Sequence, residues 1–506
     1  GAAAHSRASR GVRKRLPFAS DFRGSNHNHL WPLVAYRDLM ANRRARVWLA
    51  RSLPVLVALA VVPQLGRAHQ IVTSRFSAPL PLPLLLAGAG GTVGLTALWL
   101  AATPESTTAR SSPAVATIPS WLAIGVRHVV RGTFLLAVAY ALVAGIAGRQ
   151  VAAENIATLF VWPVWFRGVA LVSMLVGSPW ALISPWRAVY DGLTRLEDRQ
   201  LSVLGSPPAA LEAWPAVLGF VLLLGITETL TVFPQSPRLT TVIVAAYAMV
   251  MLGGAVAYGP RWLREADPLG VFYRLFGRVA PLTVTATEDG SYSLRVRPPW
   301  RGCLDPVEHG SLVVFVIATV YTVSFDGFTN TARFQSVLFG VRETLSSGPE
   351  TSVLLYLVGL AGFVGSFGVG IWAVERLGAG SATDWLAAGR WFAPTLLPIA
   401  AAYEVAHNYP YVLRNLGQLA VVASQQLGVA VEAVSPLAWL SLPVFWGSQV
   451  VLIVVGHVVA VVAAHRVAVE RYEGQTAARR GHLPLVVLMI GYTMLSLWIV
   501  SRPVIA

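Results

Sequence analysis

Cysteine and charge are both scarce in this chain, and lysine is almost absent. Its 506 residues include a single cysteine, Cys303, which excludes an intramolecular disulfide framework and any metal site built on several thiolates. Charged residues make up 12% of the chain, about half of what a water-soluble domain usually has. Lys14 is the only lysine, so the net charge of +15 comes almost entirely from arginine.

Common catalytic signatures are also missing. The sequence contains no Gly-x-Ser-x-Gly elbow, no His-Glu-x-x-His and no phosphate-binding loop. No soluble segment combines a basic patch with interleaved aromatic residues, so we expect no nucleic-acid partner. The excess of arginine is better explained as loop charge that sets the orientation of a protein in a membrane.

Hydrophobic residues make up 55% of the chain, and the mean hydropathy is +0.60. A membrane helix needs an apolar run of about 17 to 25 residues. We find ten such runs, at roughly 82–102, 129–147, 156–178, 214–234, 240–258, 311–325, 352–374, 391–409, 446–466 and 483–501. They predict an all-α polytopic membrane helix bundle with about ten transmembrane helices. The expected location is the cell membrane, with the lipid bilayer as the main partner.

The N-terminal part has a different composition. Residues 1–39 are basic, polar and without a pattern, and we interpret them as a disordered or misassigned extension that precedes a start at Met40. Residues 40–68 combine a positive segment, a short apolar core and small residues at Gly66 and Ala68, which is typical of a signal peptide. The alternative is an uncleaved first membrane helix.

Cleavage after residue 68 would leave a polytopic membrane domain at 69–506 with His69 as its first residue. A terminal histidine offers its α-amine and its imidazole together, which suits Cu(II) in a nitrogen-rich site. We therefore include His69 among the candidate metal ligands. An assembly subunit of a membrane complex that handles copper is one functional hypothesis, and the sequence names no protein partner for it.

The arginine content of the connections predicts which loops lie in the cytoplasm. Ten spans with both mature ends outside place most of the loop arginines inside, and the largest inner loop is 259–310. Its first half predicts an amphipathic interfacial helix, with apolar residues at helical spacing. Its second half alternates around Asp289-Gly290, which predicts one small cytoplasmic β-hairpin. We interpret residues 410–445, which are mixed in polarity, as an interfacial or re-entrant segment.

Six ionisable residues fall within the predicted spans or at their ends. Ionisable groups in hydrocarbon are costly, so each of them indicates a functional site by default. We predict that they converge on a polar cavity that opens outward, although each could instead cap a helix or satisfy a neighbouring backbone. The six are Arg167, Glu228, Asp326, Glu404, His407 and His457.

Two mechanisms use these residues differently. In a membrane hydrolase, Glu404, His407 and His457 would bind a divalent metal that activates water, and Asp326, Arg167 and Glu228 would be the catalytic candidates. In a proton-coupled transporter or channel, Arg167 would bind an anionic solute, while Glu228, Glu404 and His457 would relay protons. A small-molecule substrate is expected in both cases, and a divalent metal is the only cofactor that these residues suggest.

Several long phrases occur together and in order after Ala68. They include NIATLFVWPVWFRGVALVSMLVGSPWALISPWRAVY, VFPQSPRLTTVIVAAYAMVMLGGAVAYGPRWL, YEVAHNY and GHVVAVVAAHRVAVERY. Together they resemble a family of prokaryotic polytopic membrane proteins labelled fenitrothion hydrolase-like. The resemblance implies hydrolysis of an organophosphate ester. An apolar residue is usual in that family where Arg167 stands, so the resemblance does not imply a shared catalytic use of this arginine.

Overall fold

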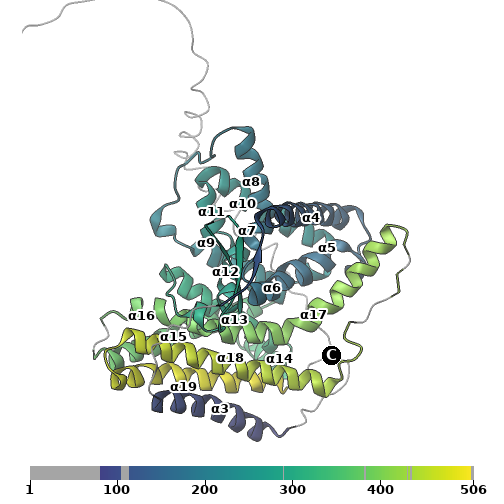
Figure 1. Cartoon of the computed structure of the whole chain (residues 1–506). Helices are drawn as coiled ribbons and strands as arrows, with labels where there is room; N and C mark the ends of the chain where they lie inside the picture. The colour runs from purple at the N-terminus through teal and green to yellow at the C-terminus, as the bar shows by residue number, and fades with distance from the viewer. Residues whose placement is uncertain are drawn as a thin grey trace, which may run out of the picture. The chain divides into compact units, whose positions relative to one another are not determined.

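Long apolar helices make up most of the part of the chain that the computed structural model describes (Figure 1). The described residues are 80–103, 113–288, 290–380, 383–429, 431–432 and 436–502, and all lie within one compact unit, Ala60–Ala506. The predicted extension at 1–39, the signal peptide at 40–68 and His69 lie outside the described residues. Those interpretations therefore stay predictions.

Nine helical segments among the described residues are long and apolar enough to cross a membrane, and they confirm nine of the ten predicted spans. Together they make the protein an all-α polytopic helix bundle and an integral membrane protein. Only 22% of the residues in the most apolar stretch of each of α3, α4 and α15 are buried, as expected of helices that contact lipid. The nine segments are α3 (Leu82–Ala102), α4 (Ser120–Ala147), α5–η2–α6 (Ile156–Val176), η3–α9–η4 (Ala209–Glu228), α10 (Pro237–Tyr258), α13 (Gly310–Thr329), α15 (Thr351–Gly378), α18 (Leu442–Arg471) and α19 (Gln475–Val500).

The tenth predicted span has a different form. Its residues, 391–409, cover the end of α16 (Trp385–Phe392), the short η8 (Ala393–Leu396) and the first part of α17 (Leu397–Gln426). Since α17 runs on through Pro410 without interruption, this helix continues into the segment that the sequence analysis interpreted as interfacial or re-entrant. Polar side chains along α17 lower its hydropathy, and this is why it does not stand out as a span.

Helix α18 packs against α17, α19 and α3, α19 also packs against α3, and Figure 1 shows α18 and α19 lying side by side above α3. A Cβ atom added at Gly456 of α18 would lie 2.4 Å from the Cβ of Ala402 and 2.8 Å from the carbonyl oxygen of Pro398, both on α17. Glycine is therefore required where these two helices approach most closely, as is common for helices packed in lipid.

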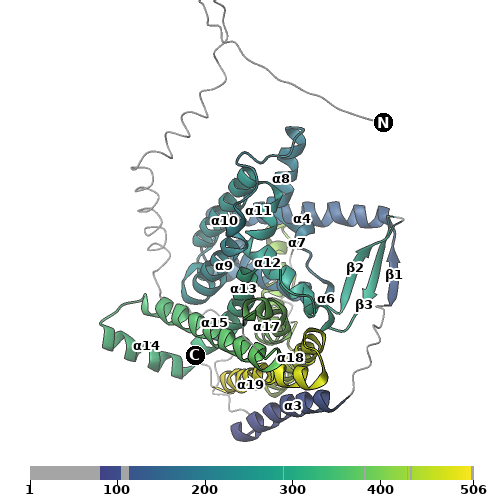
Figure 2. The same cartoon turned by 90° about the vertical axis from the view of Figure 1, so that its left-hand side faces the viewer.

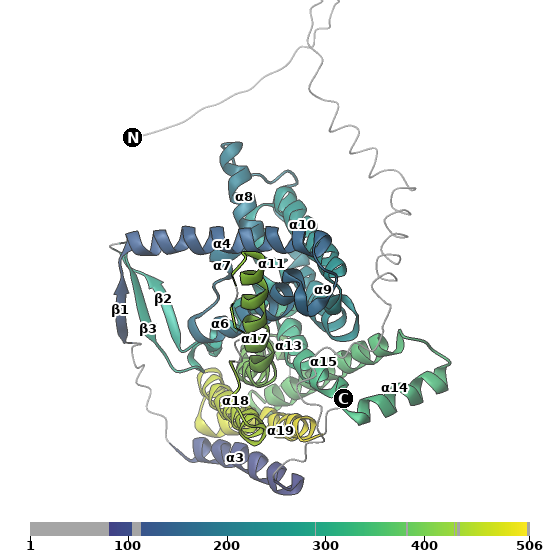
Figure 3. The same cartoon turned by 90° about the vertical axis from the view of Figure 1, so that its right-hand side faces the viewer.

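The predicted β-hairpin is present, and a third strand extends it. Strands β2 (Leu282–Ala286) and β3 (Tyr292–Val296) pair antiparallel, and Gly290 in their turn has a φ of 78°. Strand β1 (Ala114–Ile118) pairs with the other edge of β3 and gives the order β1-β3-β2. Figures 2 and 3 show this sheet beside the N-terminal end of α4, which follows β1 directly.

Two short helices form where one amphipathic interfacial helix was expected in the same loop. The chain forms α11 (Pro260–Glu265) and α12 (Pro268–Phe276), separated at Asp267, and α12 is buried on nearly all sides against α9 (Trp214–Phe220) and α6 (Val169–Val176). The prediction considered one apolar face of this helix. Val271 and Leu275 add a second apolar face, so α12 packs inside the bundle.

Shorter elements complete the described part. They are η1 (Ala152–Glu154), α5 (Ile156–Leu159), α7 (Trp180–Ile183), α8 (Pro185–Leu196), η3 (Ala209–Leu211), η5 (Phe233–Gln235), η6 (Gly277–Val279), η7 (Arg301–Cys303) and α14 (Ala332–Leu345).

Candidate functional site

Two of the candidate residues lie in π-helical segments, which are wound more widely than an α-helix. The first, η2 (Phe160–Gly168), holds Arg167 and contains Pro163, which has no backbone N–H to donate. The second, η4 (Val221–Glu228), ends at Glu228. π-helical winding is rare and is frequently found at functional sites. Arg167 and Glu228 therefore both lie in backbone of unusual winding.

Side chains stabilise this wide winding by binding backbone carbonyls. The Tyr273 hydroxyl of α12 donates to the carbonyl oxygens of Trp165 at 2.9 Å and Phe166 at 3.1 Å. The Thr229 hydroxyl donates to the carbonyl oxygen of Leu224 at 3.0 Å. Buried carbonyls that lose an α-helical partner need another donor, and these hydroxyls provide it.

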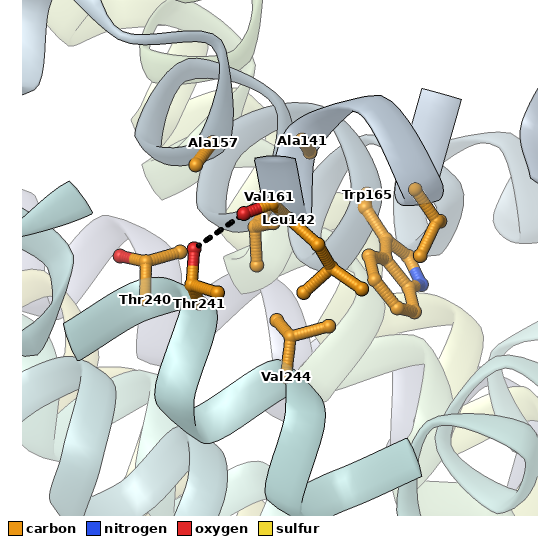
Figure 4. Close-up of a pocket in the computed structure, with 9 residues that line it drawn as sticks. Ala141, Leu142, Ala157, Val161, Trp165, Thr240, Thr241 and Val244 are labelled. Atoms are coloured by element: carbon orange, nitrogen blue, oxygen red, sulfur yellow. Dashed lines mark hydrogen bonds between the residues drawn. The ribbon is translucent and has the colours of Figure 1, made fainter. Parts of the chain in front are cut away.

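On the side that carries Val161 and Trp165, η2 packs closely against α4 and α10 (Figure 4). The indole N–H of Trp162 donates to the Thr240 hydroxyl at 2.9 Å, and the Thr241 hydroxyl donates to the Leu142 carbonyl oxygen at 3.4 Å. The apolar space between these helices leaves no room for a water molecule. The backbone around Arg167 is thus fixed by Tyr273 of α12 on one side and by α4 and α10 on the other.

Arg167 is paired with two carboxylates from two other helices. Its Nε donates to Glu228 Oε1 at 2.8 Å, and its NH1 donates to Glu404 Oε1 at 2.9 Å and Oε2 at 3.0 Å. The exposed fractions are 1% for Arg167, 2% for Glu228 and 0% for Glu404. The predicted convergence of these three residues is therefore present as a fully buried ionic cluster.

The charges in this cluster do not cancel if all three groups are ionised. One guanidinium faces two carboxylates, which leaves a net charge of −1 away from water, and an uncompensated buried charge is strongly unfavourable. Both oxygens of Glu404 accept hydrogen bonds, whereas Glu228 Oε2 has no partner among the described residues. A proton on Glu228 would neutralise the cluster and keep the bond to Arg167.

Asp326 and His407 form a second pair beside the first. His407 Nε2 lies 2.9 Å from Asp326 Oδ2, and these residues come from the end of α13 and from α17. The Asp326 carboxylate is close enough to Arg167 to attract it electrostatically. His407 follows Glu404 by three residues, so both side chains lie on the same face of α17. The side chain of His407 is 20% exposed, which makes it the most accessible member of the two groups.

His457 does not join either group. Its Nδ1 lies 2.8 Å from the carbonyl oxygen of Ile453, its ring packs 5.8 Å from that of Tyr492, and its Nε2 has no partner among the described residues. The structure thus brings together five of the six predicted residues and places the sixth against a different neighbour.

The metal ligand set expected from the sequence is not assembled. No group of three or more His, Cys, Asp and Glu side chains that could hold a metal occurs in the part of the chain described. Arg167 occupies both oxygens of Glu404, Asp326 contacts His407, and His457 lies apart from them. Copper binding at His69 concerns a residue outside the described ranges and stays a prediction.

The predicted role of Arg167 as an anion binder also lacks structural support. Two carboxylates already take up its Nε and NH1 donors, and an anionic solute would have to displace one of them inside a buried site. The arginine instead balances protein charge.

Asp267 is a buried ionisable residue that our sequence analysis did not single out. It precedes α12, and its carboxylate accepts hydrogen bonds from the Trp180 indole at 2.7 Å, from the Gly270 backbone N–H at 3.0 Å and from the Tyr247 hydroxyl. Burial raises the pKa of Asp267, and these three donors oppose that rise. An Asp before Pro at a helix start is a typical N-cap signal, and it could have been recognised.

Two neighbouring apolar cavities lie between α13, α15 and α19. The larger has a volume of about 380 Å³ and the smaller about 240 Å³, and they share Phe363 and Leu495 in their walls. The Tyr492 hydroxyl in the larger cavity donates to the Val320 carbonyl oxygen at 3.0 Å and also contacts Ser324. The larger cavity is lined in part by α13 and α17, the two helices that carry Asp326 and His407.

Comparisons with known proteins gave no match to a family model, a curated protein or a solved structure.

Proposed function

We propose that this integral membrane protein is a proton-coupled transporter in which Glu228 binds the coupling proton. The observation that supports this proposal is the unequal bonding of the two carboxylates around Arg167. Glu404 is bound through both oxygens, whereas one oxygen of Glu228 is buried and has no partner in the described part of the chain. Ionisable residues inside membrane proteins are typical of proton relays.

The exchange of one proton changes the charge of the cluster by one unit. With Glu228 protonated, Arg167 and Glu404 form a neutral pair. When the proton leaves, the extra negative charge favours movement of the cluster toward water or toward another cation. His407 is partly exposed and bonded to Asp326, so this pair is suited to pass the proton between the cluster and the aqueous side.

Infrared spectroscopy tests the proton position directly. The protein in bilayers at neutral pH is expected to show the carbonyl band of a protonated carboxylic acid, and the Glu228→Gln variant is expected to lose it. The matched control is Glu350→Gln, because Glu350 lies exposed at the start of α15. A band that persists in Glu228→Gln would place the proton elsewhere.

Transport itself requires a flux measurement. Proteoliposomes with a pH-sensitive dye inside and an imposed pH gradient should show faster proton equilibration than empty vesicles, and Glu228→Gln should abolish the difference. Equal rates for the wild type and Glu228→Gln would contradict proton coupling through this residue.

The ester hydrolase implied by the family resemblance is a second candidate. It is supported by the bond between Asp326 and His407 and by the 380 Å³ apolar cavity, which is lined in part by the same two helices, α13 and α17. Here His407 would be the general base, and Asp326 would orient its ring. The cavity wall has no charged residue, so it suits an uncharged ester.

Purified protein in detergent, assayed with a nitrophenyl phosphotriester, tests the hydrolase. His407→Gln should reduce the release of nitrophenolate to background, and His128→Gln should not, because His128 is exposed on α4. Background rates for the wild-type protein would reject this candidate and leave the transporter proposal unaffected.

A further inference from the structure

The two apolar cavities follow one another along the same three spans, α13, α15 and α19. On α19 their walls run from Val487, at the middle of the helix, to Ile499, near its end. On α15 they run from Phe367, at mid-helix, back to Leu355, near its start. The larger and the smaller cavity together therefore form one elongated space, which we call the slot.

The slot has about the length of one leaflet of a bilayer. The rise of an α-helix puts about 18 Å between Val487 and Ile499. A bilayer has a hydrocarbon core about 30 Å thick, so one leaflet contributes about 15 Å. Beside the smaller cavity, the ring centres of Phe328 and Trp498 are 6.3 Å apart, and the Arg502 guanidinium lies 4.6 Å over the Trp498 ring. Tryptophan and arginine are typical of the membrane–water boundary, so the slot reaches from this boundary to the middle of the membrane.

The slot opens sideways between α15 and α19. Ser366 on α15 and Gly491 and Leu495 on α19 line it and are exposed. Ile317 and Phe367 line the same cavity but are only 3% and 4% exposed. Exposed residues at this depth of a membrane bundle face hydrocarbon, so the bilayer is the direct source of a molecule that enters the slot.

Water is a poor occupant of this space. No charged residue of the described ranges lines the slot, and three of its hydroxyls already donate to backbone carbonyls. These bonds are Ser366 to Gly362 at 2.7 Å, Ser324 to Val320 at 3.1 Å and Tyr492 to Val320 at 3.0 Å. A buried water needs several polar partners, and an empty apolar space loses dispersion contacts along its walls. A hydrocarbon chain restores those contacts without needing a polar partner.

We propose that the slot binds one acyl chain of a membrane phospholipid, which enters between α15 and α19. The length of the slot favours a chain from one leaflet over a compact molecule. The headgroup would lie at the boundary beside Trp498, where the Arg502 guanidinium is suited to its phosphate. This site goes beyond the proton-coupled transporter and does not depend on it. A bound chain would occupy the space that the second candidate function gives to an ester.

Photo-cross-linking in bilayers tests the site. The full-length protein is reconstituted with a phosphatidylcholine that carries a diazirine at the end of one acyl chain, and cross-linked residues are identified by peptide mass spectrometry. We expect cross-links on Ile317 and Phe367, because these buried residues can be reached only through the slot. Cross-links confined to exposed residues would overturn the proposal, since the surrounding lipid produces those without any site.

Gly491→Leu narrows the opening, and Gly362→Leu is its matched control. An added Cβ meets open space at both glycines, but of the two only Gly491 lines the slot. Gly491→Leu should remove the cross-links on Ile317 and Phe367, and Gly362→Leu should leave them unchanged. Ser366→Leu narrows the slot from α15 and provides a second variant should Gly491→Leu not fold.

Two further outcomes would contradict an acyl chain in the slot. The first is an equal loss of the buried cross-links in the Gly362→Leu control, or no loss in either of the narrowing variants. The second is labelling of Ile317 and Phe367 by a diazirine-bearing hydrocarbon without a headgroup but not by the phospholipid, which would assign the slot to a free apolar molecule.

Discussion

Removing the charges of the Arg167 cluster one at a time gives the sharpest test of its charge balance. Arg167→Gln leaves two buried carboxylates without a cation, and breaking a buried ion pair in this way costs about 3 to 5 kcal/mol. Glu404→Gln weakens two hydrogen bonds to a guanidinium, and bonds to charged groups contribute about 1.5 to 3 kcal/mol each.

Glu228→Gln should behave differently from both. The amide oxygen can still accept the 2.8 Å bond from Arg167 Nε, and the substitution imitates the protonated side chain. Its cost should stay within about 1 kcal/mol, in the range of one ordinary hydrogen bond. Glu375→Gln provides a matched control, because Glu375 is also buried but pairs with Arg471 and accepts a hydrogen bond from Tyr472. Loss of the Glu375 charge should therefore destabilise the folded protein.

Thermal unfolding in detergent, followed by the fluorescence of the 17 tryptophans, measures this order. The midpoint should fall most for Arg167→Gln, less for Glu404→Gln and least for Glu228→Gln. A Glu228→Gln midpoint as low as that of Arg167→Gln would refute the assignment of the proton to Glu228. It would mean that both carboxylates are ionised and that another positive charge balances them.

Three further predictions concern other parts of the molecule. Gly225→Ala would place a Cβ 2.1 Å from the Tyr356 hydroxyl, so we expect a loss of about 1 to 3 kcal/mol in thermal unfolding, and none for Gly362→Ala, where the space is open. Burial raises the pKa of Cys303 to about 12, so N-ethylmaleimide should not label the native protein at neutral pH but should label it in SDS. Native labelling would contradict the burial of this thiol. An impermeant maleimide should label Ala286→Cys only in inside-out vesicles, and labelling in intact cells would reverse the predicted orientation.

The spans could be predicted because their signal is local. A run of about 20 apolar residues is sufficient to indicate a membrane helix, and nine such segments are present among the described residues. The same criterion predicted a span at 391–409 but missed the continuation of α17 to Gln426, because Arg414, Asn415 and Gln418 interrupt the apolar pattern there. Within the predicted span, Arg167 and Asp326 partner the side chains of Glu404 and His407.

The meeting of Arg167, Glu228 and Glu404 could also be predicted, since charges in lipid need partners. Which carboxylate pairs with which donor of Arg167, and the π-helical winding of the backbone, could not be predicted from the sequence. The π-helical winding of η2 depends on Tyr273, more than 100 residues later, and β1 pairs with a strand that is far away in the sequence. Asp267 was recognisable as a helix cap, but its burial depends on Trp180 and Tyr247 from two other helices.

A π-helical stretch can revert to α-helical winding when one residue is taken up by the neighbouring turn. Each residue of an α-helix advances the chain by about 100° around the axis, so such a shift would rotate the Arg167 side chain by roughly that angle. The guanidinium would turn away from Glu228 without unfolding the span, and the cost would be that of the broken ion pair together with a few carbonyl bonds such as those from Tyr273. A change in the winding of this one segment would then form or break a buried salt bridge.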